Sequence, residues 1–174
     1  SSRRKTIFMS EWQLFPIYLV IDSIMGRKEL VVSALENGTV LDHIPADNVY
    51  KALRILNLKG IENQITIGIN LNSKQNGKKG IIKIADKFFE DEELNKLALL
   101  APEATVNVIR DFKVVEKKKV ELPKEITGIA KCMNPKCVTN HQPITTKFTV
   151  NVKGNETSLL CHYCEKISDT KKVF

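Results

Sequence analysis

Four cysteines, the only ones in the chain, form two close pairs late in the sequence. Cys132 and Cys137 make the first pair, and Cys161 and Cys164 make the second after twenty-three intervening residues. Two short knuckles at such a distance are typical of one Zn²⁺ ion held by four thiolates. Two disulfides or four unrelated core cysteines are the alternatives, and a chain with no other cysteine argues against both.

The number of ligands predicts what the metal does. Four thiolates complete a tetrahedral shell and leave no position for a catalytic water. We therefore predict a structural zinc whose binding energy folds a segment too short to build its own core. His141 and His162 lie close to the cysteines in sequence, and either could replace one ligand, but we expect both to face solvent or a partner. Thiols that must stay reduced predict a cytoplasmic protein.

No residue pattern for catalysis is evident. The chain has no Gly-x-Ser-x-Gly, Walker or Gly-x-Gly-x-x-Gly sequence, and its three histidines are scattered. Asp42 and His43 are adjacent and could form an acid–base pair, but neighbours on a strand are expected to point to opposite faces. We therefore predict no catalytic residues and no independent enzymatic activity.

The lysines are more informative. Lys79 and Lys83 flank one expected strand and Lys117 follows another, so the three could converge near Asp42 and His43. Cationic side chains can hold phosphates, and a carboxylate can accept hydrogen bonds from ribose hydroxyls. Ordinary solvated lysines are the alternative. The net charge of +7 indicates an anionic partner without choosing among nucleic acid, nucleotide phosphate and an acidic protein face.

Hydrophobic periodicity predicts the elements that would position these residues. The expected order is strand, helix, strand, strand, helix, strand, with a further strand at the end and a weaker one at the start. This order is the split βαβ pattern of ferredoxin-like domains, an antiparallel sheet with two helices on one face. The expected strands are 29–35, 39–44, 64–70, 80–84, 104–110 and 112–115, and the expected helices are 47–58, capped by Asp47, and 91–101.

The predicted fold class is α+β: this ferredoxin-like nucleotide-binding domain, then a small all-β zinc domain with strands at 147–153 and 158–160. A charged break at 117–119 and Leu122-Pro123 places the boundary, giving domains 29–121 and 122–174. Residues 1–28 are expected to be an extension, with Met25 as an original first residue; a packing role is the alternative. Its apolar run 14–21 is too short for a bilayer, so no membrane is expected.

Four segments carry a resemblance to a known family. They are Asn37–Pro45, Ile65–Leu71, Leu97–Asn107 and the Cys132–Cys164 signature, in this order. Together they resemble the regulatory chain of aspartate carbamoyltransferase over residues 29–166. The resemblance implies a non-catalytic subunit of pyrimidine biosynthesis that binds the nucleotides ATP, CTP and UTP. It also implies regulatory dimers, and a zinc domain that docks on the catalytic chain so that catalytic trimers are bridged.

The resemblance also implies a nucleotide site, residue by residue. Lys117 and His43 would face phosphates, Asp42 and Lys83 would hold the ribose, and 32–35 with Ile109 would form the base pocket. Ser33 and Phe112 stand where some members have Glu and Tyr, which bears on base preference. A zinc-ribbon nucleic-acid-binding protein is the alternative, whereas the resemblance implies no nucleic acid. The full implied set is Val32, Ala34, Leu35, Val40, Asp42, His43, Lys79, Lys83, Asn107, Ile109, Val114 and Lys117.

Overall fold

The protein is seen in a computed structural model that describes residues 34–74 and 77–174. The predicted extension, Met25, Val32 and Ser33 lie outside the described residues, as does most of the strand expected at 29–35. Its last two residues, Ala34 and Leu35, are described and do not form a strand. No helix in the described part is long and apolar enough to cross a membrane.

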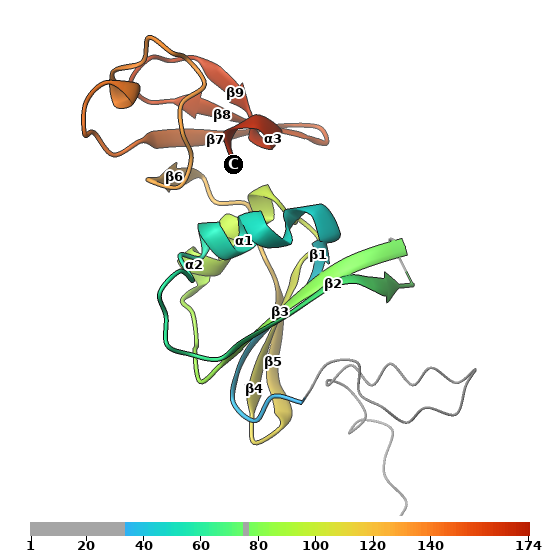
Figure 1. The fold of residues 1–174 in the computed structure, drawn as a ribbon. Helices are drawn as coiled ribbons and strands as arrows, with labels where there is room; N and C mark the ends of the chain where they lie inside the picture. Colours follow the sequence, from blue (N-terminus) through green and yellow to red (C-terminus); the bar gives the residue numbers. More distant parts are fainter. Residues whose placement is uncertain (1–33, 75–76) are drawn as a thin grey trace, which may run out of the picture.

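The larger sheet has five antiparallel strands in the order β2-β3-β1-β4-β5 (Figure 1). The first four strands have the arrangement expected of a split βαβ domain, and β5 adds an edge strand beside β4. The predicted fold class is confirmed. The strands are β1 (Gly38–Pro45), β2 (Ile65–Ser73), β3 (Gly77–Ala85), β4 (Thr105–Arg110) and β5 (Lys113–Lys119).

The helices over this sheet are shorter than predicted. A 3-10 turn, η2 (Ala46–Asn48), precedes α1 (Val49–Ile55), and α2 (Asp91–Asn95) continues into the 3-10 helix η3 (Lys96–Leu99). Asp47 was predicted to cap the first helix, which is wrong: Asn48 stands at the cap position and no side chain caps the helix. The Asn48 side chain instead donates a hydrogen bond to the Leu100 carbonyl at 2.8 Å.

The first helix ends at a Schellman motif and not at Gly60. Asn57 adopts a left-handed conformation with φ of 51°. Its backbone N–H donates to the Arg54 carbonyl at 3.0 Å, and that of Leu58 donates to Leu53 at 3.1 Å. This pair of bonds is the usual way to satisfy the last carbonyls of a helix, and Asn tolerates the conformation better than other residues with a Cβ.

The two faces of the larger sheet have different surroundings. Neighbouring side chains on a strand point to opposite faces, so Val40 and Leu41 of β1 mark the two sides. Leu41 belongs to the main core, which the sheet forms with α1, α2 and η3. Val40 belongs to a smaller cluster on the face away from the helices, with Ile81 and Ile109. The face without helices is therefore partly apolar and available for a ligand.

The second sheet contains β6 (Glu125–Thr127), β7 (Lys147–Lys153), β8 (Glu156–Cys161) and β9 (Ile167–Asp169), in that order. Two short helices accompany it, η4 (Val138–Asn140) and α3 (Thr170–Val173). Both predicted strands are present, but β6, β9 and the helices were not predicted. Phe148 and Leu159 are fully buried in its core, alongside three of the cysteines.

Candidate functional site

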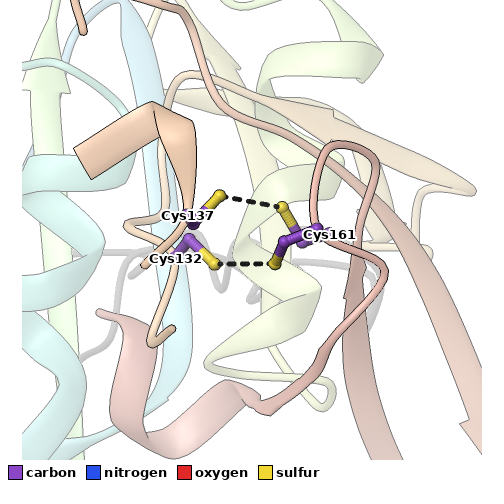
Figure 2. A group of neighbouring side chains, drawn as sticks. Cys132, Cys137 and Cys161 are labelled. Atoms are coloured by element: carbon purple, nitrogen blue, oxygen red, sulfur yellow. Dashed lines mark hydrogen bonds between the residues drawn. The ribbon is translucent and has the colours of Figure 1, made fainter. Parts of the chain in front are cut away.

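The four cysteine sulfurs of the second sheet lie together. Their Sγ atoms are all within 4.8 Å of one another. Cys132 and Cys164 are 3.6 Å apart, and Cys137 and Cys161 are 3.8 Å apart. Figure 2 shows the sulfurs of Cys132, Cys137 and Cys161 turned toward one region from separate turns of the chain. A disulfide would require about 2.05 Å, so these sulfurs are not paired covalently.

These separations fit one tetrahedral metal ion. A metal–sulfur bond of about 2.3 Å in tetrahedral geometry gives sulfur–sulfur separations of about 3.8 Å. Cys132, Cys137 and Cys161 are buried and Cys164 is half-buried. The donor set is therefore enclosed, sulfur-only and correctly spaced for a cation. When bound there, such a cation supplies a crosslink between the two cysteine pairs.

Backbone amides also face each sulfur, in a repeated pattern. The N–H of the second residue after each cysteine donates to that cysteine's sulfur, and the N–H of Cys164 adds a second bond to Cys161. Such bonds favour the thiolate form that a metal requires. The four donors at this spacing are Asn134, Thr139, Tyr163 and Lys166.

The four thiols differ in proton affinity. Burial raises the pKa of Cys132 to about 12 and also raises the pKa of Cys161. The hydroxyl of Thr139, 3.2 Å from the sulfur, lowers the pKa of Cys137. At Cys164, burial acts upward, but hydrogen bonds to the sulfur lower the pKa to about 6. Because two thiols resist ionisation, a complete set of four thiolates requires a positive charge at its centre.

Two polar side chains fix the first knuckle. The Asn140 amide donates to the carbonyls of Cys132 at 3.0 Å and Asn134 at 2.8 Å. His141 Nε2 lies 2.7 Å from the Pro135 carbonyl, so this nitrogen donates to the backbone and does not point at the sulfurs. No histidine of the described residues belongs to the ligand cluster, as we expected. Asn140 was not singled out from the sequence, because a tether of this kind has no spacing signature.

A second group of candidate residues forms a row across the larger sheet. Directly paired residues of antiparallel strands share a face, and the register pairs Val40 with both Lys83 and Asn107, and Asn107 with Lys117. Val40 lies on the face without helices, so all four side chains do. Ile109 lies on this face too, with Leu35 and Val114 packed beside it.

Asp42 forms an ionic cluster next to this row. Its carboxylate is fully buried, and the Lys79 ammonium lies 2.9 Å and 3.0 Å from its two oxygens. His43 Nδ1 lies 2.9 Å from Asp42 Oδ2 and 3.3 Å from the Thr105 hydroxyl. A carboxylate only accepts hydrogen bonds, so Nδ1 carries a proton and the outer Nε2 is left for another group.

This contact corrects one sequence-based argument. Adjacent residues were expected to point to opposite faces, which is wrong for Asp42 and His43. His43 has φ of 59°, and the pairing of β1 with β3 shifts between Leu41 and Ile44. The extra residue is a β-bulge, and it turns His43 toward its neighbour. Bulges of this kind re-aim a side chain and frequently stand next to functional sites.

Lys83 is the most enclosed cation in the row. It is only 3% exposed, and burial lowers the pKa of its ammonium. It lines a pocket of about 230 Å³, together with Ala34 and Leu35 from the segment before β1. Lys117 lies within β5 and is exposed, so residues 117–119 are part of the sheet and not a break between domains. Phe112 is 50% exposed in the turn before β5.

Comparisons with known proteins agree with these two sites. The sequence profile for the aspartate carbamoyltransferase regulatory chain, allosteric domain, matches residues 30–121, and the profile for its metal binding domain matches residues 124–174. The chain belongs to this family. Its membership confirms the resemblance found in the sequence and the prediction of a regulatory chain that is not itself an enzyme.

Individual relatives match most of the chain. The aspartate carbamoyltransferase regulatory chain of Bacteroides thetaiotaomicron is 53% identical over 148 residues, which are 85% of this chain and 96% of the relative. That of Phocaeicola vulgatus is 52% identical over 141 residues, 81% of this chain and 90% of the relative. That of Pyrococcus horikoshii is 48% identical over 147 residues, which are 83% of this chain and 96% of the relative. Membership of this family implies that the chain has the catalytic chain of aspartate carbamoyltransferase as a partner.

Proposed function

We propose that this regulatory chain senses ATP, CTP and UTP on the sheet face without helices and passes the signal to the catalytic chain. The observation that carries the proposal is the row from Lys83 to Lys117, with the ionic cluster of Asp42, His43 and Lys79 beside it. The row and the ionic cluster contain three lysines and one carboxylate, which favours an anionic ligand there, while Glu36 and Asp86 also line the pocket beside Lys83. The apolar cluster next to the row suits a base, because half-buried side chains such as Leu35 and Val114 pack against its buried members.

Each part of a nucleotide has a matching group. Lys117 is exposed on β5 and His43 presents its outer nitrogen, so these two face the phosphates. Asp42 and Lys83 are buried on the same face and hold the ribose. Ile109 belongs to the apolar cluster against which Leu35 packs, and these apolar side chains receive the base. The rest of the proposed site is Val32, which lies outside the described residues, with Ala34, Val40, Lys79, Asn107 and Val114.

The metal is proposed to be one structural Zn²⁺ bound by Cys132, Cys137, Cys161 and Cys164. A closed shell of four thiolates suits zinc because zinc prefers tetrahedral geometry and sulfur ligands. The metal fixes the fold of the second sheet, and this domain docks on the catalytic chain. We assign residues 29–121 to the nucleotide domain and 122–174 to the zinc domain.

The proposed assembly joins catalytic trimers. Regulatory chains pair through their nucleotide domains, and each zinc domain contacts a catalytic chain in the cytoplasm, in the pathway of pyrimidine biosynthesis. Nucleotides that share a site act in opposite directions only if they bind the two quaternary states with different affinity. Such coupling typically amounts to about 1–3 kcal/mol.

The test is the variant Lys117→Ala in the holoenzyme assembled with its catalytic chain. Loss of one phosphate contact should weaken CTP and ATP binding by about tenfold or more and remove their effect on carbamoyl transfer. Assembly should be unchanged, because Lys117 is exposed on an edge strand. Lys153→Ala, an exposed cation of the zinc domain, is the matched control. A normal nucleotide response in Lys117→Ala would contradict the assignment.

A second titration separates this proposal from nucleic-acid binding. The isolated chain is titrated with CTP and with duplex DNA at two salt concentrations. A nucleic-acid-binding protein loses affinity steeply with salt, because binding releases counterions from the phosphate backbone. Saturable CTP binding that requires Lys117, without comparable DNA affinity, supports the regulatory site. DNA binding that exceeds CTP binding would favour the zinc-ribbon alternative.

A further inference from the structure

A second pocket lies on the opposite side of the larger sheet, where α1 and η3 meet the zinc domain. Its volume is about 440 Å³, larger than the pocket beside Lys83, and within the range of about 300–1,000 Å³ common for small-ligand sites. Lys51 and Arg54 of α1 and Lys96 of η3 line one side. Ile129 and Phe174 line the other side. In Figure 1 the helices lie between the larger sheet and the end of the chain.

The two walls of this junction pocket are held together by packing. Leu99, in the same 3-10 helix as Lys96, is buried in the core of the zinc domain with Ile126 and Ala130. The pocket is thus bounded by both parts of the chain. It is also separate from the nucleotide-facing row, because the main core and the sheet lie between them.

No acidic side chain lines the pocket, and no ion pair engages Lys51, Arg54 or Lys96 in the part of the chain that the structure describes. The carboxyl group of Phe174, the last residue given, is the one anionic group among the lining residues. Arg54 lies in the last turn of α1, where the helix dipole favours a positively charged side chain. That accounts for Arg54 alone and leaves the two lysines unexplained. Three cations exceed the single carboxyl group of Phe174, and cations that lie together repel one another unless further anions lie among them.

We propose that this junction pocket binds a small polyanionic phosphate compound. Arg and Lys together favour phosphate oxygens, with Arg able to bind two at once. The apolar side chains of Ile129 and Phe174 leave one wall for a non-polar part of such a ligand. A ligand that touches both walls favours one relative placement of the two domains. This regulatory consequence rests on the proposed function, whereas binding at the pocket does not.

Inorganic tripolyphosphate, titrated by calorimetry into the full chain that carries Lys117→Ala, is the probe. Lys117→Ala removes the proposed phosphate contact of the opposite face, and no nucleotide is present that would itself fill the junction pocket, so phosphate binding reports on the junction. Arg54→Ala and Lys96→Ala should each weaken it by about tenfold, and Arg54→Lys should recover part of the loss. Lys153→Ala, an exposed cation elsewhere on the zinc domain, should leave it unchanged.

The outcomes separate the two sites. Tripolyphosphate binding that is absent, or equally weakened by Lys153→Ala, would overturn the junction site as non-specific attraction. Binding that survives both Arg54→Ala and Lys96→Ala would overturn it too. CTP affinity should stay normal in Arg54→Ala and fall in Lys117→Ala. If Lys117→Ala leaves CTP binding intact while Arg54→Ala weakens tripolyphosphate, the nucleotide site fails and the junction site stands.

Discussion

The buried carboxylate of Asp42 permits a quantitative test of the ionic cluster. Asp42→Asn keeps the shape of the side chain and removes its charge. The carboxylate is fully buried and Lys79 is 11% exposed, so the variant removes a negative charge that lies 2.9 Å from a largely enclosed ammonium. Removing one partner of a buried pair costs about 3–5 kcal/mol. Since Lys79 retains some access to water, we expect the lower end, about 3 kcal/mol.

That loss is large beside a typical stability of about 5–15 kcal/mol. For a chain of this size it corresponds to a decrease in Tm of roughly 6–12 °C. The assay is urea unfolding followed by far-UV circular dichroism, with metal present and without nucleotide, so that only the fold is tested. Asp47→Asn is the matched control, because Asp47 is exposed and should change the free energy of unfolding by less than about 0.5 kcal/mol.

A double variant makes the cause specific. If loss of the Asp42–Lys79 pair is responsible, the double variant Asp42→Asn with Lys79→Met should lose less stability than the two single variants lose together, by about 0.5–3 kcal/mol. Additive losses, or an Asp42→Asn chain as stable as the control, would refute the reasoning. In the second case the charge of Asp42 would not contribute to the stability of the fold.

Two further predictions concern the metal and the buried lysine. Cys161→Ser should lose the metal, unfold the zinc domain and release the chain from the catalytic trimer; full assembly on gel filtration with no bound zinc would contradict this. For Lys83, burial lowers the pKa below its ordinary value of 10.5. Between the folded and unfolded pKa values the unfolded chain therefore binds more protons, so the free energy of unfolding should rise with pH relative to Lys83→Met. Urea unfolding at several pH values between the two pKa values measures the free energy of unfolding of the wild-type chain and of Lys83→Met. Lys153→Met, compared with the wild-type chain in the same way, is the control. A decrease of the wild-type value relative to Lys83→Met as the pH rises would mean that the charge of Lys83 stabilises the fold.

The metal cluster was predictable from sequence because a cation imposes its own geometry on the ligands. Four cysteines in two knuckles have few ways to surround one ion, so spacing alone brought Cys132, Cys137, Cys161 and Cys164 together. The strands were predictable for a related reason. Alternation in β2 and β-branched residues in β1 are local signals that survive in the folded chain.

The contact between Asp42 and His43 could not be predicted from the sequence pattern. A bulge depends on the pairing of β1 with β3, and no residue near His43 signals a left-handed backbone as a glycine would. The end of α1 was misjudged for a similar reason, because Leu56 completes the apolar period of the helix and Gly60 is the next glycine, whereas the chain already turns at Asn57. Leu56 and Leu58 are both buried in the main core, although the helix does not continue through them. Residues 117–119 were predicted to be a charged break between domains, but they are the end of an edge strand, where exposed lysines are tolerated.

The connection between the two sheets explains how a ligand on one could influence the other. Val120 follows β5 directly and is buried in the main core, where its N–H donates to the Ala104 carbonyl at 3.4 Å. Ile126 of β6, six residues later, is buried in the core of the zinc domain. The connecting segment is thus anchored in both cores and is too short to absorb much movement. Lys117 lies three residues before the first anchor, so if a nucleotide binds Lys117 as proposed, a shift of Lys117 toward the phosphates would also displace Val120. Because a packed core moves as a unit, a displacement of β5 would be transmitted to the zinc domain and would not be absorbed by the connecting segment.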